Sequence, residues 1–447
     1  MTRSEQLGQA AGPVAAPGGA AQDRTGAGKT IAEKLLSAKS ATDARAGDIV
    51  LASVDVAYSH DGNRPLPMDL IADMGASGVW DPARYFLVLD HYPRPNEAVA
   101  SSHTKLGAFA QAQGVTIYAV GDGISHVVLP ENGHILPGDL VIGSDSHTCT
   151  SGALGAFATG VGSTDMAAVL ATGKIWLRVP ETLLVRCTGR FAPGVRPKDL
   201  ALEITGLLGA DGATYQAIEY AGDAIDRMDM DGRLTLANMA IEVGAKAGLV
   251  ATDATTDAWL RERTDRSWAA IAADCDARYV RVVEIDVGTL VPKVARPHNV
   301  DNVVDAASLR GVPVHQVVIG TCNAARIDDL AEAARILAGK RVAPGVRLYV
   351  TPPSRKIMLE AMRRDILAPL VAAGAVVGTP GCSGCVGGCH AAIPDAGENV
   401  LTTANRNFKG RLGNPDAFLY LGSAATAAAS ALTGRITDPR DLVDDVE

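Results

Sequence analysis

The stretch 136–182, LPGDLVIGSDSHTCTSGALGAFATGVGSTDMAAVLATGKIWLRVPET, decides the fold class of this chain. A short apolar run, Leu140–Ile142, comes before a polar turn, and a long segment rich in small helix-forming residues follows. A strand, a polar turn and a helix in this order are typical of α/β layers. The stretch therefore predicts an α/β fold with parallel strands.

The same alternation recurs along the 447 residues, which are too many for one ordinary core. Pro- and Gly-containing stretches near 180–197 and 288–300 suggest boundaries. We expect three α/β domains with largely parallel sheets, at 26–180, 181–298 and 299–447, the last ending in a helix. Residues 1–25, rich in Ala, Gly and Pro, are expected to be a disordered tail. The predicted strands are Tyr85–Leu89, Ile117–Val120, Leu140–Ile142, Val317–Ile319, Leu348–Val350 and Ala375–Val377.

Composition narrows the classes of partner. The formal net charge is −9 without a run of Lys and Arg, so the sequence predicts neither nucleic-acid nor membrane binding. No stretch approaches the roughly 20 consecutive apolar residues of a membrane span, and no signal peptide opens the chain. We expect a cytoplasmic protein whose partner is a small molecule or another protein.

Polar residues gather where the predicted strands end. Asp90 and His91 follow one strand, His126 follows another, and Asp145, Ser146 and His147 follow the strand in the opening stretch. Cys322 and the pair Cys382 and Cys385 follow two later strands. Because ligands bind at the carboxyl ends of parallel strands, the position of these residues directly after strands predicts one shared crevice.

The motif CSGC at 382–385 has three interpretations. A structural zinc site needs four ligands and usually two such pairs, whereas a dithiol redox motif normally opens a helix. An iron–sulfur cluster on Cys382, Cys385 and the distant Cys322 would account for all three cysteines. Cys187 and Cys275 are predicted to be small core residues, and Cys389 is the substitute if one of the three ligands is wrong.

Several long motifs carry a family resemblance. The opening stretch, together with GKTIAEKLL at 28–36, TLANMAIEVGAKAGL at 235–249 and NRNFKGRLG at 405–413, resembles the aconitase superfamily. The similarity is greatest to the large subunits of 3-isopropylmalate dehydratase and homoaconitase, and it extends from about Lys29 to Gly422.

The resemblance implies a [4Fe-4S] cluster on Cys322, Cys382 and Cys385, with one iron left free to act as a Lewis acid. Asp90 and His91 match the pair that protonates the departing hydroxyl. His126, Asp145 and His147 match the groups that bind water and hydroxyl at that iron, supported by Glu242. Asn238 and Asn405 match amides near the cluster, and Ser146, Asn405, Arg406 and Arg411 match residues that bind the substrate.

Two features depart from the family pattern. Family members usually read Cys-Thr-Asn around the first ligand, whereas this chain reads Cys322, Asn323, Ala324. The usual second-position amide is therefore absent, and Asn323 is a possible replacement. The swivelling domain that carries the family's catalytic serine cannot be placed after Gly413, so we expect a separate small subunit to supply it.

The resemblance predicts a hydro-lyase or isomerase that dehydrates and rehydrates a di- or tricarboxylic hydroxy acid similar to 3-isopropylmalate. A homoaconitase-like enzyme and an alkylmalate dehydratase of specialised metabolism are alternatives. A non-catalytic scaffold and a cluster-bearing sensor that binds RNA are alternatives of another class.

Overall fold

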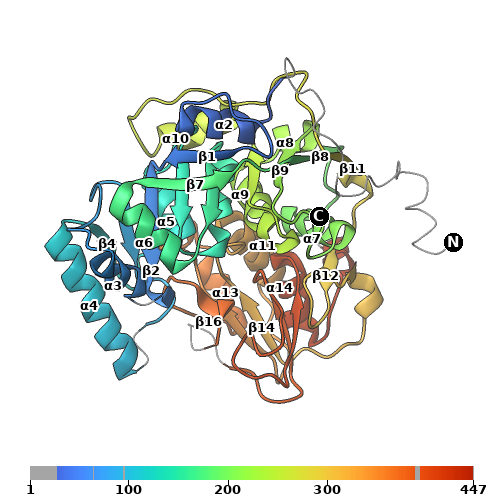
Figure 1. Cartoon of the computed structure of the whole chain (residues 1–447). Coiled ribbons are helices and arrows are strands. Elements are labelled where there is room, and N and C mark those ends of the chain that lie inside the picture. Colours follow the sequence, from blue (N-terminus) through green and yellow to red (C-terminus); the bar gives the residue numbers. More distant parts are fainter. Residues whose placement is uncertain (1–27, 64, 94–95, 388–392, 446–447) are drawn as a thin grey trace.

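The computed structural model describes residues 28–445, except for Arg64, residues 94–95 and residues 388–392. The predicted disordered tail and Cys389 lie outside the described residues. The chain has a mixed α/β fold with several largely parallel sheets, as the alternation in the sequence predicts (Figure 1).

The first large sheet has the strand order β4-β3-β2-β5-β6, and all its neighbours pair in parallel. An antiparallel ribbon of β1 and β7 lies beside it (Figure 1). The strands of this part are β1 (Ile49–Ser53), β2 (Val56–His60), β3 (Tyr85–Val88), β4 (Thr116–Tyr118), β5 (Leu140–Gly143), β6 (Phe157–Gly160) and β7 (Lys174–Arg178). The helices are α2 (Ile31–Ser40), α3 (Leu66–Asp73), α4 (Glu97–Gln113), α5 (Ser125–Glu131) and α6 (Ser163–Thr172).

A second parallel sheet has the order β10-β9-β8-β11. Its strands are β8 (Thr182–Thr188), β9 (Ala217–Ala221), β10 (Ala247–Val250) and β11 (Arg281–Asp286). The helices of this part are α7 (Pro197–Leu208), α8 (Asp223–Asp226), α9 (Met230–Met239) and α10 (Ala254–Arg261). The buried helix α9 packs against the 3-10 segment η2 (Ser146–Leu154), so the second sheet's helices reach the strand ends of the first.

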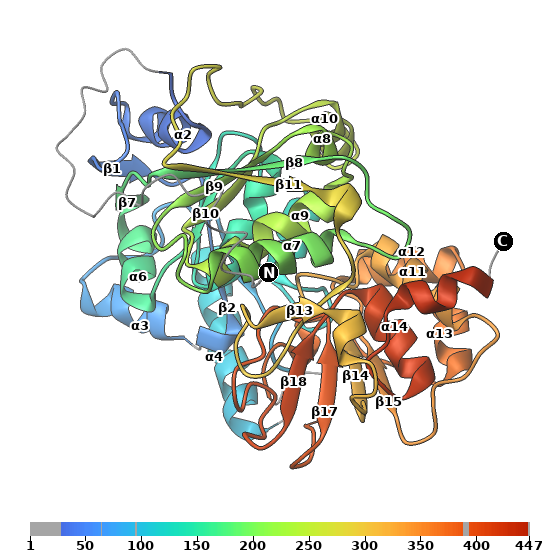
Figure 2. The same cartoon turned by 90° about the vertical axis from the view of Figure 1, so that its right-hand side faces the viewer.

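The third sheet has seven strands in the order β13-β12-β18-β17-β14-β15-β16. The five from β18 to β16 run parallel, and β12 and β13 form an antiparallel edge (Figure 2). Its strands are β12 (Lys293–Ala295), β13 (Val303–Asp305), β14 (Gln316–Ile319), β15 (Arg347–Val350), β16 (Val376–Val377), β17 (Asn399–Thr402) and β18 (Phe418–Leu421). Its helices are α11 (Ile327–Leu337), α12 (Arg355–Arg363), α13 (Leu367–Ala373) and α14 (Ala424–Thr433).

The six predicted strands are confirmed, as β3, β4, β5, β14, β15 and β16. Cys187 is buried in β8, but the prediction for Cys275 is wrong, because this residue is exposed in a turn. The division into three domains stays a prediction, and β12 lies before the predicted boundary at 298 although it pairs within the third sheet. Within the described residues, no helix combines the length and apolarity that crossing a membrane requires.

Candidate active site

The first sheet delivers an acid–histidine pair at the end of β3. Asp90 Oδ1 lies 2.6 Å from His91 Nδ1, and the other oxygen of Asp90 accepts from the Ser125 amide at 2.8 Å. Both side chains are buried. Burial alone would lower the pKa of His91, but negative charge on Cys382, Asp90 and Asp61 raises it well above its usual value. The imidazole is therefore built to keep its proton.

Asp145 lies near four histidines at the end of β5, and His91 Nε2 is 4.0 Å from its Oδ2. Its Oδ1 is 3.0 Å from His126 Nε2, its Oδ2 is 3.5 Å from His60 Nε2, and its Oδ1 lies 3.5 Å from His147 Nδ1. Burial would raise the pKa of Asp145, yet the histidines hold it well below its usual range. The carboxylate thus stays ionised and fixes the rings around it.

A glycine at the last position of β5 makes room for this arrangement. A side chain at Gly143 would lie 2.5 Å from the Tyr58 ring and 2.1 Å from the Thr148 hydroxyl. The Tyr58 hydroxyl lies 2.8 Å from His126 Nδ1 and donates to Thr148 Oγ1 at 2.8 Å. Tyr58 can therefore orient the far edge of the His126 ring only because position 143 has no side chain.

A row of charged side chains connects the first two sheet regions of the polypeptide to the third. Glu242 Oε1 lies 2.7 Å from His147 Nε2, and Arg406 Nε donates to both oxygens of Glu242, at 2.9 and 3.0 Å. Burial would raise the pKa of Glu242, but His147 and Arg406 lower it. Ser146 Oγ lies 3.4 Å from His147 Nδ1, at the start of the same group.

The three predicted cysteine ligands lie together. Cys322 and Cys382 are buried in one cluster with Ile124 and Val127, against which Cys385 packs. Sulfur atoms of Cys382 and Cys385 come within 4.8 Å of each other and of a ring nitrogen of His91, while Cys322 is grouped in the same way with His126 and His147. The ends of β14 and β16 thus bring thiols 60 residues apart in the sequence to one place, beside the histidines.

Amide groups surround the Cys322 sulfur. Asn238 Nδ2 donates to it at 3.3 Å and Asn405 Nδ2 at 3.7 Å, and Asn405 also donates to Asn238 Oδ1. Thr321, just before the cysteine, has a φ of 74°, a left-handed conformation that a β-branched residue rarely adopts. The backbone therefore accepts local strain to aim this thiol.

A charged group serves the other thiols. Arg411 Nη2 donates to Cys385 Sγ at 3.1 Å. The hydrogen bond from Cys382, together with His91 and Arg411, holds the pKa of Cys385 well below its usual value despite burial. The backbone amide of Cys382 donates to the Asp90 carbonyl at 2.9 Å, so the cysteine turn is tied to the acid–histidine pair.

Comparison with known proteins agrees with this geometry. The model of the aconitase family (aconitate hydratase) matches residues 89–311 and 305–434. The chain belongs to the aconitase family. Among its relatives is the 3-isopropylmalate dehydratase large subunit 1 of Methanopyrus kandleri, 47% identical over 415 residues, which are 92% of this chain and 99% of the relative. The 3-isopropylmalate dehydratase large subunit of Elusimicrobium minutum is 47% identical over 93% of this chain and 99% of its own length. Large subunit 1 of Thermotoga maritima is 46% identical over 93% of this chain and the whole of its own length.

The donor set in this aconitase-family chain fits an iron–sulfur cluster. Three thiols stand in one partly apolar site, and N–H groups point at two of their sulfurs, a pattern that stabilises thiolates bound to a cluster. Cys382 caps the 3-10 turn η6 (Ser383–Cys385) and Cys385 ends it, so CSGC does not open an α-helix as a dithiol redox motif normally would.

Sequence reasoning missed several residues of the site. His60 stacks on His91 with ring centroids 4.3 Å apart, and Asp61 Oδ2 lies 2.9 Å from His103 Nε2. Asp61 also accepts from the His91 backbone at 3.0 Å. His60 is the last residue of β2 and Asp61 follows it, so the rule that located the other strand-end residues would have found them had VAYSH been recognised as a strand. Lys198, discussed below, carried no such signal.

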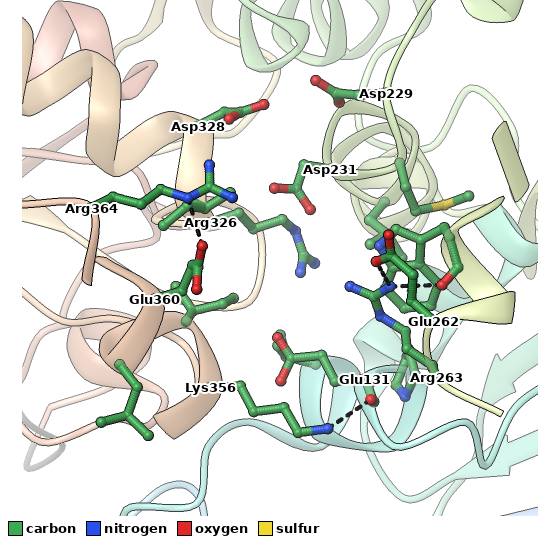
Figure 3. A pocket seen from close by; sticks show the side chains of 18 of the residues that line it. Glu131, Asp229, Asp231, Glu262, Arg263, Arg326, Asp328, Lys356, Glu360 and Arg364 are labelled. Carbon is green, nitrogen blue, oxygen red and sulfur yellow. Dashed lines mark hydrogen bonds and ion pairs between the residues drawn. The ribbon is translucent and has the colours of Figure 1, made fainter. Parts of the chain in front are cut away.

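A cavity lies to one side of this site. It has a volume of about 640 Å³ and lies among α5, α9, α10, α11 and α12 (Figure 3). Of the predicted site residues, only His126 lines it. Charged groups of both signs surround it, and Arg364 Nε and Glu360 Oε1 pair at 2.6 Å. Burial raises the pKa of Asp231 to about 7 there. The cavity therefore contains little of the candidate active site.

Proposed function

We propose that this chain is the large subunit of a [4Fe-4S] hydro-lyase that dehydrates and rehydrates a malate-type hydroxy acid similar to 3-isopropylmalate. The observation that carries the proposal is a trio of thiols beside a buried acid–histidine pair. The relatives, which match this chain over nearly its whole length, are named as large subunits of 3-isopropylmalate dehydratase.

Cys322, Cys382 and Cys385 would hold the cluster, since each sulfur lies in the shared site. When bound, a cluster with one iron not held by a thiolate supplies a Lewis acid for the substrate hydroxyl. The remaining chemistry falls to side chains that orient groups and move protons.

His91 is the proposed proton donor. Its Nδ1 faces Asp90, so Nε2, which lies 4.0 Å from Asp145 Oδ2, is the nitrogen that would pass its proton to a departing hydroxyl. Asp90 orients the ring and stabilises its charged form, which keeps the acid loaded at neutral pH. His60, stacked on His91, limits rotation of the ring.

The neighbouring residues are proposed to position water and carboxylates. Asp145 fixes His126 and His147, and Glu242 bridges His147 to Arg406. Arg406 bonds Glu242 through Nε, so its terminal nitrogens remain to bind a substrate carboxylate. Ser146, Asn405 and Arg411 complete the proposed binding edge.

A separate small subunit is the proposed partner, since the relatives are named as large subunits. It would bring the catalytic serine that acts as base and the pocket that reads the substrate's side chain. Homocitrate-like and other alkylmalate substrates are therefore alternatives that this chain alone does not distinguish.

The test is anaerobic reconstitution of the purified chain with iron and sulfide, followed by addition of the small subunit. We expect thiolate-to-iron absorption in the loaded chain, and alkene absorbance when the complex is given 3-isopropylmalate. A chain that remains colourless would contradict the cluster. A loaded complex inactive on 3-isopropylmalate but active on homocitrate-like acids would correct the substrate.

A further inference from the structure

A buried lysine contacts Asn323, the residue that follows Cys322. Lys198 is 2% exposed and stands in the first turn of α7, directly after Pro197. The start of a helix carries partial positive charge and normally favours acidic residues, and burying an ammonium group is costly. A lysine held at this position against both penalties calls for an explanation.

The contacts of Lys198 are polar but uncharged. Its Nζ donates to Asn323 Oδ1 at 2.5 Å and to the Ala404 carbonyl at 3.0 Å, and Met239 Sδ lies 3.5 Å away. Within residues 28–445 as described, these are its hydrogen-bond partners, and no carboxylate forms an ion pair with it. Its positive charge is therefore not cancelled by a directly paired acid.

Lys198 fixes the polarity of a chain of amides. An ammonium group only donates, so the oxygen of Asn323 must face it and the NH₂ of Asn323 must face away. That NH₂ donates to the Thr235 carbonyl and to Asn238 Oδ1, both at 3.1 Å. Because Asn238 accepts on its oxygen, its own NH₂ points at the Cys322 sulfur at 3.3 Å. Lys198 thus fixes the orientation of Asn323, and Asn323 acts together with Asn405 to hold the Asn238 oxygen away from the thiol.

The hydrogen-bonded row of amides also explains why position 323 departs from the family pattern. Asn323 does not bond the sulfur itself; it links Lys198 to Asn238, and its side chain is fully buried. Burial lowers the pKa of Lys198 to about 8, while Glu242 and negative charge on Cys322 counteract this change.

We propose that Lys198 is a positioning residue that, through Asn323 and Asn238, aims an N–H donor at the Cys322 sulfur and raises the reduction potential of the bound cluster. The proposal rests on the proposed cluster function. Reduction adds one electron to the cluster, so a nearby fixed positive charge and a donor on the sulfur both stabilise the reduced form.

The test is a redox titration of the reconstituted chain and its K198M variant, followed by the spectroscopic signal of the reduced cluster. At a fixed potential near the midpoint we expect the ratio of reduced to oxidised cluster to fall about tenfold in K198M, about 59 mV for one electron. K198R keeps the positive charge and the hydrogen-bond donor, so its reduction potential should stay close to the wild-type value.

The matched control is K293M. Lys293 is also largely buried, but its Nζ lies 2.8 Å from Glu203 and from Asp305, away from the thiols. We expect K293M to change the thermal midpoint without moving the potential. An unchanged potential in K198M, or equal shifts in both variants, would overturn the inference.

A K198Q variant carries the same comparison if K198M does not fold, because a neutral amide neither supplies the charge nor fixes the polarity of Asn323. A wild-type chain that binds no iron would overturn the proposed function together with this inference. A loaded wild type with unshifted variants would overturn the inference alone.

Discussion

The two halves of the cysteine site are held by different forces. Around Cys322 the donors are neutral amides, of Asn238 and Asn405, whose orientation depends on a hydrogen-bond chain. Around Cys382 and Cys385 the partners are charged, with His91 on one side and Arg411 on the other. The direct donors to sulfur are thus neutral amides at Cys322, with Lys198 acting through them, and a charged guanidinium at Cys385, so substitutions should affect the two halves in different ways.

The largest effect is expected when either half of the cysteine site loses a cluster ligand. C322S and C385S should each lose most of the iron bound after anaerobic reconstitution, because a cluster needs each thiolate. The control is C149S, since Cys149 is as buried as Cys322 and donates to backbone carbonyls of Ser146 and Asn238. Full iron content in C385S would refute the ligand assignment.

A smaller loss, of activity and not of iron, should follow when the ion pair between Arg406 and Glu242 is weakened. R406K removes the Nε contact with both oxygens of Glu242, and we expect kcat/KM of the complex to fall about a hundredfold. Iron content should remain unchanged. R440K is the matched control, because Arg440 also contacts both oxygens of one acid, Asp438, far from the thiols. Equal rates in both variants would remove Arg406 from the site.

The charged half also makes a prediction about pH. Asp90 helps to raise the pKa of His91, so D90N should lower that pKa and let the ring lose its proton at lower pH. The alkaline limb of the kcat profile should move to lower pH, with a loss of about tenfold or more in rate at neutral pH. A profile identical in D90N and wild type would rule out this pair as the acid.

The neutral half should respond mainly in cluster lifetime. In N238D, an ionised carboxylate cannot donate to the Cys322 sulfur, so we expect the cluster to decay severalfold faster in air. N407D is the control, because Asn407 is as buried and donates to the carbonyls of Arg296 and Asn299 instead. Faster decay in both variants would assign the effect to general destabilisation.

The smallest effect on activity is expected at a buried acid outside both halves. Glu219 accepts from the Ile31 amide and the Tyr279 hydroxyl, and burial raises its pKa to about 7. The folded state thus holds its proton longer than the unfolded state, so stability is full below about pH 4.5 and falls as pH rises to about 7.

E219Q should remove this fall, which amounts to about 3 kcal/mol, and leave the kcat of the complex unchanged. Denaturant unfolding of both proteins at pH 5 and pH 8 measures the difference. Parallel losses of stability in the two proteins would show that Glu219 is ionised in the fold.

The sequence predicted the strand-end residues well, because a buried run followed by Asp, His or Cys has a clear periodicity. Cys322 after β14 and Asp145 after β5 are such cases. It did not predict His60, since the strand that carries it contains a serine within a five-residue run. Cys275 was placed in the core wrongly, because an apolar stretch without a pairing partner stays a turn.

Lys198 lay beyond sequence reasoning for a different reason. A single lysine after a proline at a helix start normally faces water, and its burial depends on contacts with residues 125 and 206 positions away. The amide chain from Lys198 to Cys322 exists only when the helices of one sheet reach the strand ends of another. Such tertiary contacts leave no local pattern.

The peptide hydrogen bond from Cys382 to the Asp90 carbonyl has a consequence for damage and repair. If the turn that carries the thiols shifts when metal is lost, the strand end that bears the proton donor shifts with it. An enzyme without its metal would then also lose the position of its proton donor. Refilling the metal would rebuild the donor in the same event.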